Sequence, residues 1–185
     1  IAEHKKGFLI ALAILLVAVF LLNIASSCSV LVEGGVTALG VSTYPSEDSD
    51  MLAAEAQYCA MEAELQSKLD NYEATYDYDE YHFDLDEIGH DPYVLISALT
   101  ALKGGAWTLD EVQSELQLLF DKQYILTETV ETEIRYRPET RHDEDGNPYT
   151  VQVPYEYTIC TVTLENFDLS HVPVYVMSED QLALY

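Results

Sequence analysis

The sequence predicts an α+β protein with an N-terminal transmembrane helix, then a long helix and a helical hairpin, then an antiparallel β-hairpin or sheet. Three observations lead to this prediction. An apolar stretch without charged residues fills positions 7–25. Apolar residues then recur at steps of three and four to about residue 120, as on the buried face of a helix. From Tyr124 they recur at steps of two, as in a strand with one covered face.

The chain is strongly acidic. It has 33 Asp and Glu residues against 8 Lys and Arg residues, and its formal net charge is −25. Proteins that bind DNA or RNA neutralise phosphates with a basic surface, so this composition excludes a nucleic-acid partner. Because 49% of the residues are apolar and 14 are Tyr, the chain has enough apolar surface to build a folded core despite its charge.

The N-terminal apolar stretch fits a membrane span. No charged or polar side chain occurs from Gly7 to Leu22, and Ile24 and Ala25 extend the stretch. About 19 residues make roughly 28 Å of helix, which matches the hydrocarbon core of a bilayer. Basic residues precede the span at positions 4–6, so the N-terminus is expected in the cytoplasm and the body outside the cell membrane.

Three fates of this stretch stay open: an uncleaved anchor, a cleaved secretory signal, and a lipoprotein signal that ends before Cys28. Small residues at positions 25–27 precede Cys28, which is therefore a candidate lipidation site. The first residue is Ile rather than Met, so the start of the gene product is expected to lie upstream.

Four segments are expected along the chain. Residues 1–27 form a cytoplasmic tip and transmembrane anchor, and glycine-containing residues 28–47 form a linker. Residues 48–177 form the extracytoplasmic α+β module. In residues 178–185, Ser178 and Gln181 have the spacing of a capping box, so a helix is expected to begin there and to lead to a missing C-terminal domain.

A long helix is expected after the acidic segment Ser46–Asp50, which suits the positive end of a helix dipole. One apolar stripe follows it, and the stripe fits either core packing or a seam with a partner helix. The residues of this candidate interaction stripe are Tyr58, Met61, Leu65, Leu69 and Tyr72.

Two shorter helices are expected next. Asp91-Pro92 is typical of a helix start, and Gly104-Gly105 is typical of a helix end. Thr108 and Glu111 have the spacing of a capping box that opens a second helix. The short connection predicts a helical hairpin.

Two long strands follow. Asp145-Gly146-Asn147 is a turn signal between them, so they are expected to form an extended antiparallel hairpin. Val172, Val174 and Val176 predict a third, edge strand. The alternating residues of the two long strands are Tyr124, Leu126, Val130, Ile134 and Tyr136 in the first, and Tyr149, Val151, Val153, Tyr155, Tyr157 and Ile159 in the second.

The sequence assigns no catalytic, cofactor-binding or metal-binding residue. A calcium-binding loop needs glycine at its sixth place and glutamate at its twelfth. Counted from Asp77 these places hold His82 and Ile88, and counted from Asp143 they hold Pro148 and Pro154. No C-x-x-C pair indicates zinc. A Cys59–Cys160 disulfide is compatible with an extracytoplasmic body. The cysteines and histidines allow the thiol–histidine pairs Cys160 with His171, and Cys59 with His82 or His90. No local feature of the sequence indicates that any of these thiols is activated.

Three runs of the sequence carry a family resemblance. They are the alanine- and glutamate-rich helix 50–69, the run 81–96 with Asp84-Leu-Asp-Glu-Ile-Gly-His-Asp-Pro-Tyr, and Cys160-Thr-Val-Thr-Leu-Glu-Asn with the later Leu169-Ser-His-Val-Pro-Val-Tyr. Together they resemble the N-terminal, non-catalytic region of membrane-anchored cell-wall hydrolases encoded on conjugative elements of Gram-positive bacteria. In that family the region precedes a papain-like peptidase domain of the NlpC type.

The resemblance implies no catalytic residue in this chain, because the family's nucleophile motif, a Cys-Ser-Gly-like sequence with a downstream His, is not among these residues. It implies an accessory module that positions a cysteine-type peptidoglycan peptidase at the wall. Expected partners are the membrane, through residues 7–25, together with peptidoglycan and proteins of the conjugation machinery. The alternative is an adhesion or assembly module with no enzyme attached.

Overall fold

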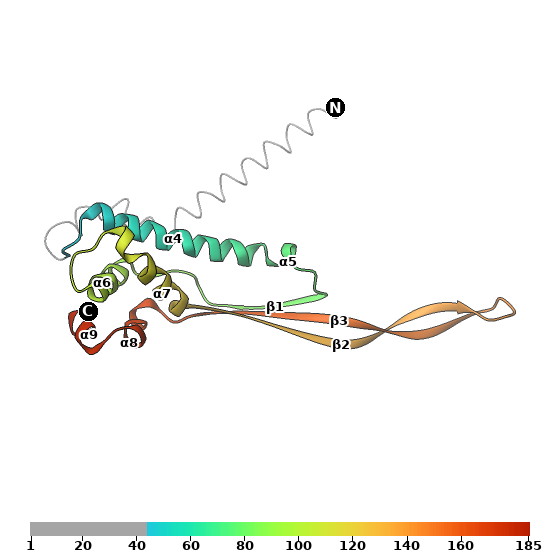
Figure 1. The fold of residues 1–185 in the computed structure, drawn as a ribbon. Helices are drawn as coiled ribbons and strands as arrows, with labels where there is room; N and C mark the ends of the chain where they lie inside the picture. Colours follow the sequence, from blue (N-terminus) through green and yellow to red (C-terminus); the bar gives the residue numbers. More distant parts are fainter. Residues whose placement is uncertain (1–43) are drawn as a thin grey trace, which may run out of the picture. The chain divides into compact units, whose positions relative to one another are not determined.

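The computed structural model describes residues 44–185, which form an α+β fold with a three-stranded mixed sheet (Figure 1). These residues divide into two compact units. Unit 1 comprises residues up to Gln66, 88–123 and 167–185, and unit 2 comprises residues 67–87 and 124–166. The stretch expected as one module, 48–177, therefore contributes to two units.

The predicted transmembrane helix, residues 7–25, and the lipidation candidate Cys28 lie outside the described residues. Among residues 44–185, no helix is long and apolar enough to cross a membrane.

The expected long helix is α4, Asp48–Asp70, and a short helix α5, Tyr72–Thr75, follows it. Asp48 and Asp50 lie in the first turn of α4 and Lys68 in the last turn, which suits the helix dipole at both ends. In unit 1, the part of α4 up to Gln66 contributes Met51, Ala54 and Tyr58 to the core. The apolar spacing of the sequence therefore corresponds to a buried helix face.

The helical hairpin is confirmed. Helix α6, Pro92–Lys103, begins where the Asp91 carboxylate accepts a hydrogen bond from the Tyr93 amide, and it ends at Gly104 with φ of 72°, a conformation that favours glycine. The 3₁₀ helix η1, Leu109–Val112, leads into α7, Gln113–Gln123. The core residues of this hairpin are Leu95, Ile96, Ala98, Leu99, Val112, Leu116 and Leu119.

The predicted strand at residues 172–176 is wrong. This segment contains the 3₁₀ helix η2, Leu169–His171, and helix α8, Pro173–Val176. Proline at the first position of a helix supplies a suitable φ and needs no amide donor there, so Pro173 favours a helix start over a strand edge. The capping box of Ser178 and Gln181 is confirmed at the start of α9, Glu179–Leu184.

Unit 1 contains a buried imidazole between two carboxylates. His90 Nδ1 lies 2.9 Å from Glu62 Oε1, and His90 Nε2 lies 3.0 Å from Glu55 Oε2. The His90 side chain is 2% exposed, and the Tyr58 ring packs against it edge-on. Burial alone would lower the pKa of His90, but the hydrogen bonds and charges of Glu55 and Glu62 outweigh it and raise this pKa to about 9.

A second set of buried polar contacts adjoins this histidine. The Tyr58 hydroxyl donates a hydrogen bond to Gln123 Oε1 at 2.8 Å, and Gln123 Nε2 donates to the Gly89 carbonyl at 3.0 Å. Tyr58 and Gln123 are fully buried, so their polar atoms need partners inside the unit. These bonds connect α4, the end of α7 and the segment before α6.

Unit 2 contains the sheet, with the strand order β1-β3-β2. The expected antiparallel hairpin is confirmed as β2, Tyr124–His142, and β3, Pro148–Asn166. Its turn has the Asp143 carboxylate accepting hydrogen bonds from the amides of Asp145 and Asn147. The third strand is β1, Glu80–Leu85, which pairs parallel to the inner half of β3.

One face of the sheet is covered within unit 2 by the end of α4 and by α5. Leu69 and Tyr72 are buried there, and the Tyr72 hydroxyl lies 3.7 Å from Cys160 Sγ. The Tyr72 ring also contacts the rings of Tyr81 and Phe83 on β1. Burial raises the pKa of the Tyr72 hydroxyl, which is therefore neutral at physiological pH.

The pKa of His90 leads to a prediction about stability. An unfolded His has a pKa near 6.5, so the protonated imidazole stabilises the fold fully below about pH 6.5. This contribution, about 3 kcal/mol from the two pKa values, is lost as the pH rises from 6.5 through 9. Urea unfolding of the chain and of a His90→Gln variant at pH 6 and pH 10 should show this loss only in the unsubstituted chain.

Equal pH dependence in the two proteins would contradict this account. A His90→Ala variant is expected to lose about 3–5 kcal/mol at pH 6, because it leaves two buried carboxylates without their partner.

Candidate interaction surface

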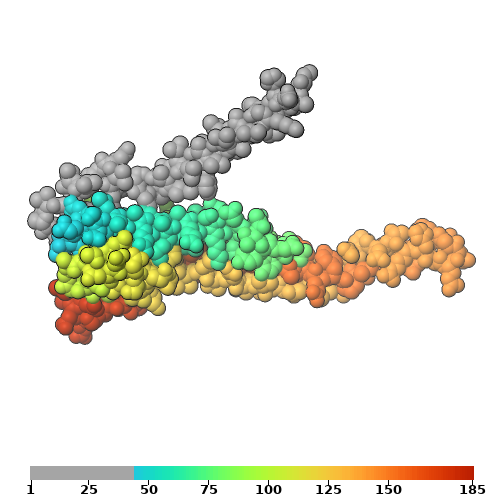
Figure 2. Space-filling view, turned by 45° about the horizontal axis from the view of Figure 1, so that its top comes forward, coloured from blue at the N-terminus to red at the C-terminus, as the bar shows by residue number. Residues whose placement is uncertain are grey.

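The outer half of the β2–β3 hairpin is a two-stranded ribbon. Pairing of β1 with β3 starts at Glu80 and Ile159, whereas β2 and β3 stay paired as far as His142 and Pro148 (Figure 1). Residues 132–142 and 148–158 are called the distal ribbon below. No helix of unit 2 covers it, and the face shown in Figure 2 has this orange segment at its surface.

The register places the two apolar stripes of the hairpin on opposite faces. Ile134 and Tyr136 of β2 lie opposite Glu156 and Pro154 of β3. Since paired residues share a face, these two apolar side chains do not meet the apolar stripe of β3, which lies at its odd-numbered positions. Val130, Ile134 and Tyr136 are 47%, 58% and 64% exposed.

The expectation that this stripe of β2 is covered holds for Tyr124, which is buried, and is wrong for Val130, Ile134 and Tyr136. The other stripe, on β3, lies opposite charged side chains of β2: Glu133 pairs with Tyr157, Arg135 with Tyr155, and Arg137 with Val153. The long charged side chains partly cover this stripe with their apolar stems.

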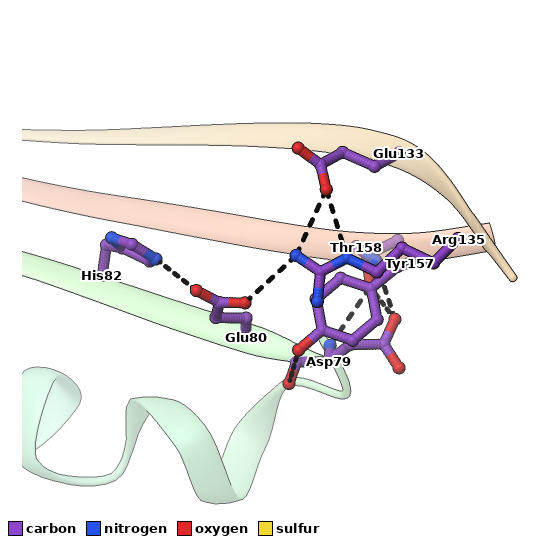
Figure 3. Close-up of polar contacts among 7 residues, drawn as sticks. All are labelled: Asp79, Glu80, His82, Glu133, Arg135, Tyr157 and Thr158. Atoms are coloured by element: carbon purple, nitrogen blue, oxygen red, sulfur yellow. Dashed lines mark hydrogen bonds and ion pairs between the residues drawn. The ribbon is translucent and has the colours of Figure 1, made fainter. Parts of the chain in front are cut away.

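Arg135 connects all three strands where the sheet narrows to two (Figure 3). Its guanidinium carbon lies 3.4 Å from the centroid of the Tyr157 ring, a cation–π contact between β2 and β3. Its nitrogens lie 3.2 Å from Glu133 Oε2 and 3.5 Å from Glu80 Oε2. Hydrogen bonds from His82 and Tyr157, together with the nearby Arg135 charge, hold the pKa of Glu80 below its usual range.

Asp79 fixes the start of β1 beside this cluster. Its carboxylate accepts hydrogen bonds from the Thr158 amide at 2.7 Å and the Thr158 hydroxyl at 2.9 Å, and its amide donates to the Thr158 carbonyl at 3.0 Å (Figure 3). The bonds to Thr158 lower the pKa of Asp79. A negatively charged Asp79 therefore marks the end of the three-stranded region.

The structure separates the candidate thiol–histidine pairs. Cys160 is free and fully buried, with the Tyr72 hydroxyl beside its sulfur, so the Cys59–Cys160 disulfide is wrong. His171 is exposed on η2 in unit 1, whereas Cys160 belongs to unit 2.

The other two histidines are engaged by carboxylates. Cys59 is disulfide-bonded and therefore has no thiol for either histidine to deprotonate. His82 Nε2 lies 2.8 Å from Glu80, and both ring nitrogens of His90 contact glutamates. In the part of the chain that the structure describes, no three His, Cys, Asp or Glu residues are arranged to hold a metal ion.

The candidate interaction stripe on α4 and α5 lies mostly inside the fold. Tyr58, Leu69 and Tyr72 are buried, and Met61 and Leu65 are half-buried. A partner for this stripe stays a prediction, and only Met61 and Leu65 offer it accessible surface.

The sequence did not single out Arg135, Tyr157 or Asp79. The one available signal was the run of charged residues at alternate positions of β2, which indicates a strand face but not its cross-strand partners. Comparisons with protein-family models, curated proteins and solved structures found no match.

The Asp79 contacts predict a local effect. An Asp79→Ala variant should exchange its Thr158 amide hydrogen faster than the unsubstituted chain, because that amide loses its carboxylate acceptor. Hydrogen exchange followed by NMR measures this. The matched control is Asp77→Ala, which removes the same charge two residues earlier, and equal exchange in both variants would contradict the role of Asp79.

Proposed function

We propose that this chain is the membrane-tethered, extracytoplasmic accessory module of a peptidoglycan hydrolase of a conjugative element, and that the distal ribbon is its binding surface. The resemblance of three sequence runs to cell-wall hydrolases motivates the first part. The exposed apolar side chains of Ile134 and Tyr136 are the observation that carries the second part. In this proposal the module binds and positions, and a peptidase domain of the NlpC type cuts.

The base of the ribbon supports this role because it is held by side chains as well as by the strand ladder. Arg135, Tyr157 and Glu80 connect the strands, and Asp79 fastens β1 to β3. An isolated two-stranded hairpin is marginally stable in water, so the anchored base gives the outer residues a more defined geometry. A preordered surface loses less conformational entropy on binding than a mobile one.

The charge distribution also suits a selective binding surface. The three arginines of the chain, Arg135, Arg137 and Arg141, all lie on β2 in the distal ribbon. A net charge of −25 opposes nonspecific contact with anionic polymers of the envelope. The ribbon thus presents three cations together with the exposed side chains of Ile134 and Tyr136.

The alternative function is an adhesion or assembly module of the envelope or the conjugation apparatus with no enzyme attached. The same exposed stripe favours it, since exposed apolar residues on an anchored strand suit a protein partner. The two functions differ in whether binding by the ribbon changes the rate of wall hydrolysis.

The accessory role predicts that the chain itself does not cut peptidoglycan. The full chain in detergent, incubated with purified sacculi, should release no more soluble muropeptide than a heat-inactivated sample. A muramidase serves as the positive control, and chromatography of the soluble fraction gives the measurement. Release of fragments by the full chain would contradict the proposal.

The positioning role predicts an effect of the ribbon on an attached enzyme. A peptidase of the NlpC type joined after Tyr185 should hydrolyse the wall of living cells at least about tenfold faster than the same peptidase secreted free, because tethering raises its effective concentration. An Ile134→Ser/Tyr136→Ser variant should lose much of this gain, because in this proposal the ribbon binds at the wall and positions the tethered enzyme. Its free energy of unfolding should change by less than about 1 kcal/mol, since both side chains are exposed.

The control is Thr129→Ala, a substitution on the other face of β2 that should keep the gain. Wall turnover measured with labelled peptidoglycan gives the rates. The ribbon variant could bind envelope proteins more weakly than the unsubstituted chain and yet hydrolyse the wall at the full tethered rate. That result would replace the accessory function by the assembly function.

A further inference from the structure

Among the described residues, no further strand pairs with the outer edge of β2 from Leu126 to Tyr136. In the sheet order β1-β3-β2, strand β2 has a neighbour on one side only among the described residues. The Thr158 carbonyl of β3 accepts a hydrogen bond from the Asp79 amide, on the side of β3 where β1 lies. Because backbone groups alternate in direction along a strand, the even-numbered residues of β3 all direct theirs towards β1 and away from β2. Even residues of β2 pair with even residues of β3, and their backbone groups therefore point away from β3 to the open edge.

Only one of the two open edges of the distal ribbon suits a further strand. On β3 the outward positions include Pro154, which has no amide donor and interrupts a ladder. On β2 the outward positions from Leu126 to Tyr136 contain no proline, and the first one is Pro138. Charged side chains and proline usually block pairing at an edge, and β2 carries both. Its charges do not block a strand with complementary charges, and the run from Leu126 to Tyr136 precedes Pro138.

The side chains along this edge identify the partner. The odd positions of β2 read Glu131, Glu133, Arg135, Arg137. When a second β2 lies antiparallel with Ile134 opposite its own counterpart, Glu133 faces Arg135 of the second copy and Glu131 faces Arg137 of the second copy. The two-fold symmetry repeats both contacts, which gives four ion pairs and no like-charge pair among these positions.

Neighbouring registers are unfavourable for the same residues. Centring on Tyr136 places Arg135 opposite Arg137, and centring on Thr132 places Glu131 opposite Glu133. Centring on Glu133 or Arg135 places a charge opposite its own copy. Like charges directly opposite destabilise a strand pair, so the sequence of charges selects the register centred on Ile134.

The backbone and the apolar face agree with this register. Ile134 directs its backbone groups outward, so it forms a hydrogen-bonded pair with its counterpart, and the charged residues fall at the adjacent pairs whose Cα atoms are closer, about 4.5 Å apart. On the opposite face Ile134 contacts Ile134 of the second copy, and Tyr136 lies opposite Thr132. Pairing covers part of the apolar stripe that is exposed in one copy.

We propose that two copies of this chain associate through their β2 edges, antiparallel and centred on Ile134, to form a continuous sheet with the strand order β3-β2-β2-β3 in the distal ribbons. The association rests on edge hydrogen bonds and on the Glu131–Arg137 and Glu133–Arg135 charges. It does not depend on an attached hydrolase or on binding to the wall, so its failure leaves the accessory function to be judged by the tests above.

The test uses charge reversal outside the Arg135 cluster. Sedimentation equilibrium of the full chain in detergent with reductant present should give a concentration-dependent dimer. Glu131→Lys alone and Arg137→Glu alone should each weaken this dimer at least about tenfold, because each places like charges opposite one another twice. An equimolar mixture of the two variants should regain the unsubstituted affinity, since every reversed residue then faces an opposite charge.

Glu139→Lys is the matched control, because Glu139 faces Thr129 in this register and its reversal should leave the affinity unchanged. Circular dichroism verifies that each variant is folded. A chain that is monomeric at all concentrations overturns the proposal. So does a dimer that ignores both reversals, or a mixture that is no tighter than either variant alone.

Cross-linking checks the register directly. Ile134→Cys should yield a disulfide-linked dimer with diamide, because the two thiols face each other across the symmetry axis. Thr132→Cys should yield less, since its counterpart is displaced by four residues, or roughly 13 Å along the strand. The native cysteines contribute equally to both variants. Equal cross-linking of the two variants overturns the register. If the β2 edge binds a different protein and no second copy of this chain, the dimer is overturned.

Discussion

The unbroken antiparallel ladder between β2 and β3 determines most of what unit 2 presents to its surroundings. It pairs Tyr124 with Asn166 at one end and His142 with Pro148 at the other, without a bulge to change the facing of side chains. One register therefore decides the face of every residue over the whole hairpin. A shift by one residue would turn Ile134 and Tyr136 towards the charged face and would separate Arg135 from Tyr157.

Two ionic arrangements show how an acidic chain uses its few cations. His90 lies between Glu55 and Glu62 inside unit 1, where burial is the opposing cost and two carboxylates keep the imidazole protonated. Arg135 lies at the surface of unit 2, where solvent screens its ion pairs, so they contribute little stability. Its role is to connect three strands at the point where the sheet narrows to two. The first arrangement contributes stability, and the second defines the base of the distal ribbon.

The proposed functions depend on the surface of unit 2 and not on the buried polar groups. Two of the reactive groups that the sequence offers are buried and engaged, Cys160 with Tyr72 and His90 with its glutamates. The exposed side chains of Ile134 and Tyr136 lie with the three arginines on one strand of the distal ribbon. Such an arrangement suits recognition of a partner, and the open edge of β2 adds backbone groups to the same surface.

The sequence by itself determined the elements whose signals are local. The periodicity of α4, the Asp91 and Gly104 ends of α6, the Ser178–Gln181 cap and the Asp145-Gly146-Asn147 turn depend on residues a few positions apart, and all were predictable. Tertiary structure alone decided that Glu80–Leu85 is the third strand and that Pro173 begins a helix. It also decided which part of the apolar stripe of β2 is buried and which part is exposed. It also brought together His90 with Glu55 and Glu62, and Arg135 with Tyr157. Those contacts join residues far apart in the chain, and their energy depends on burial and register, which no local pattern encodes.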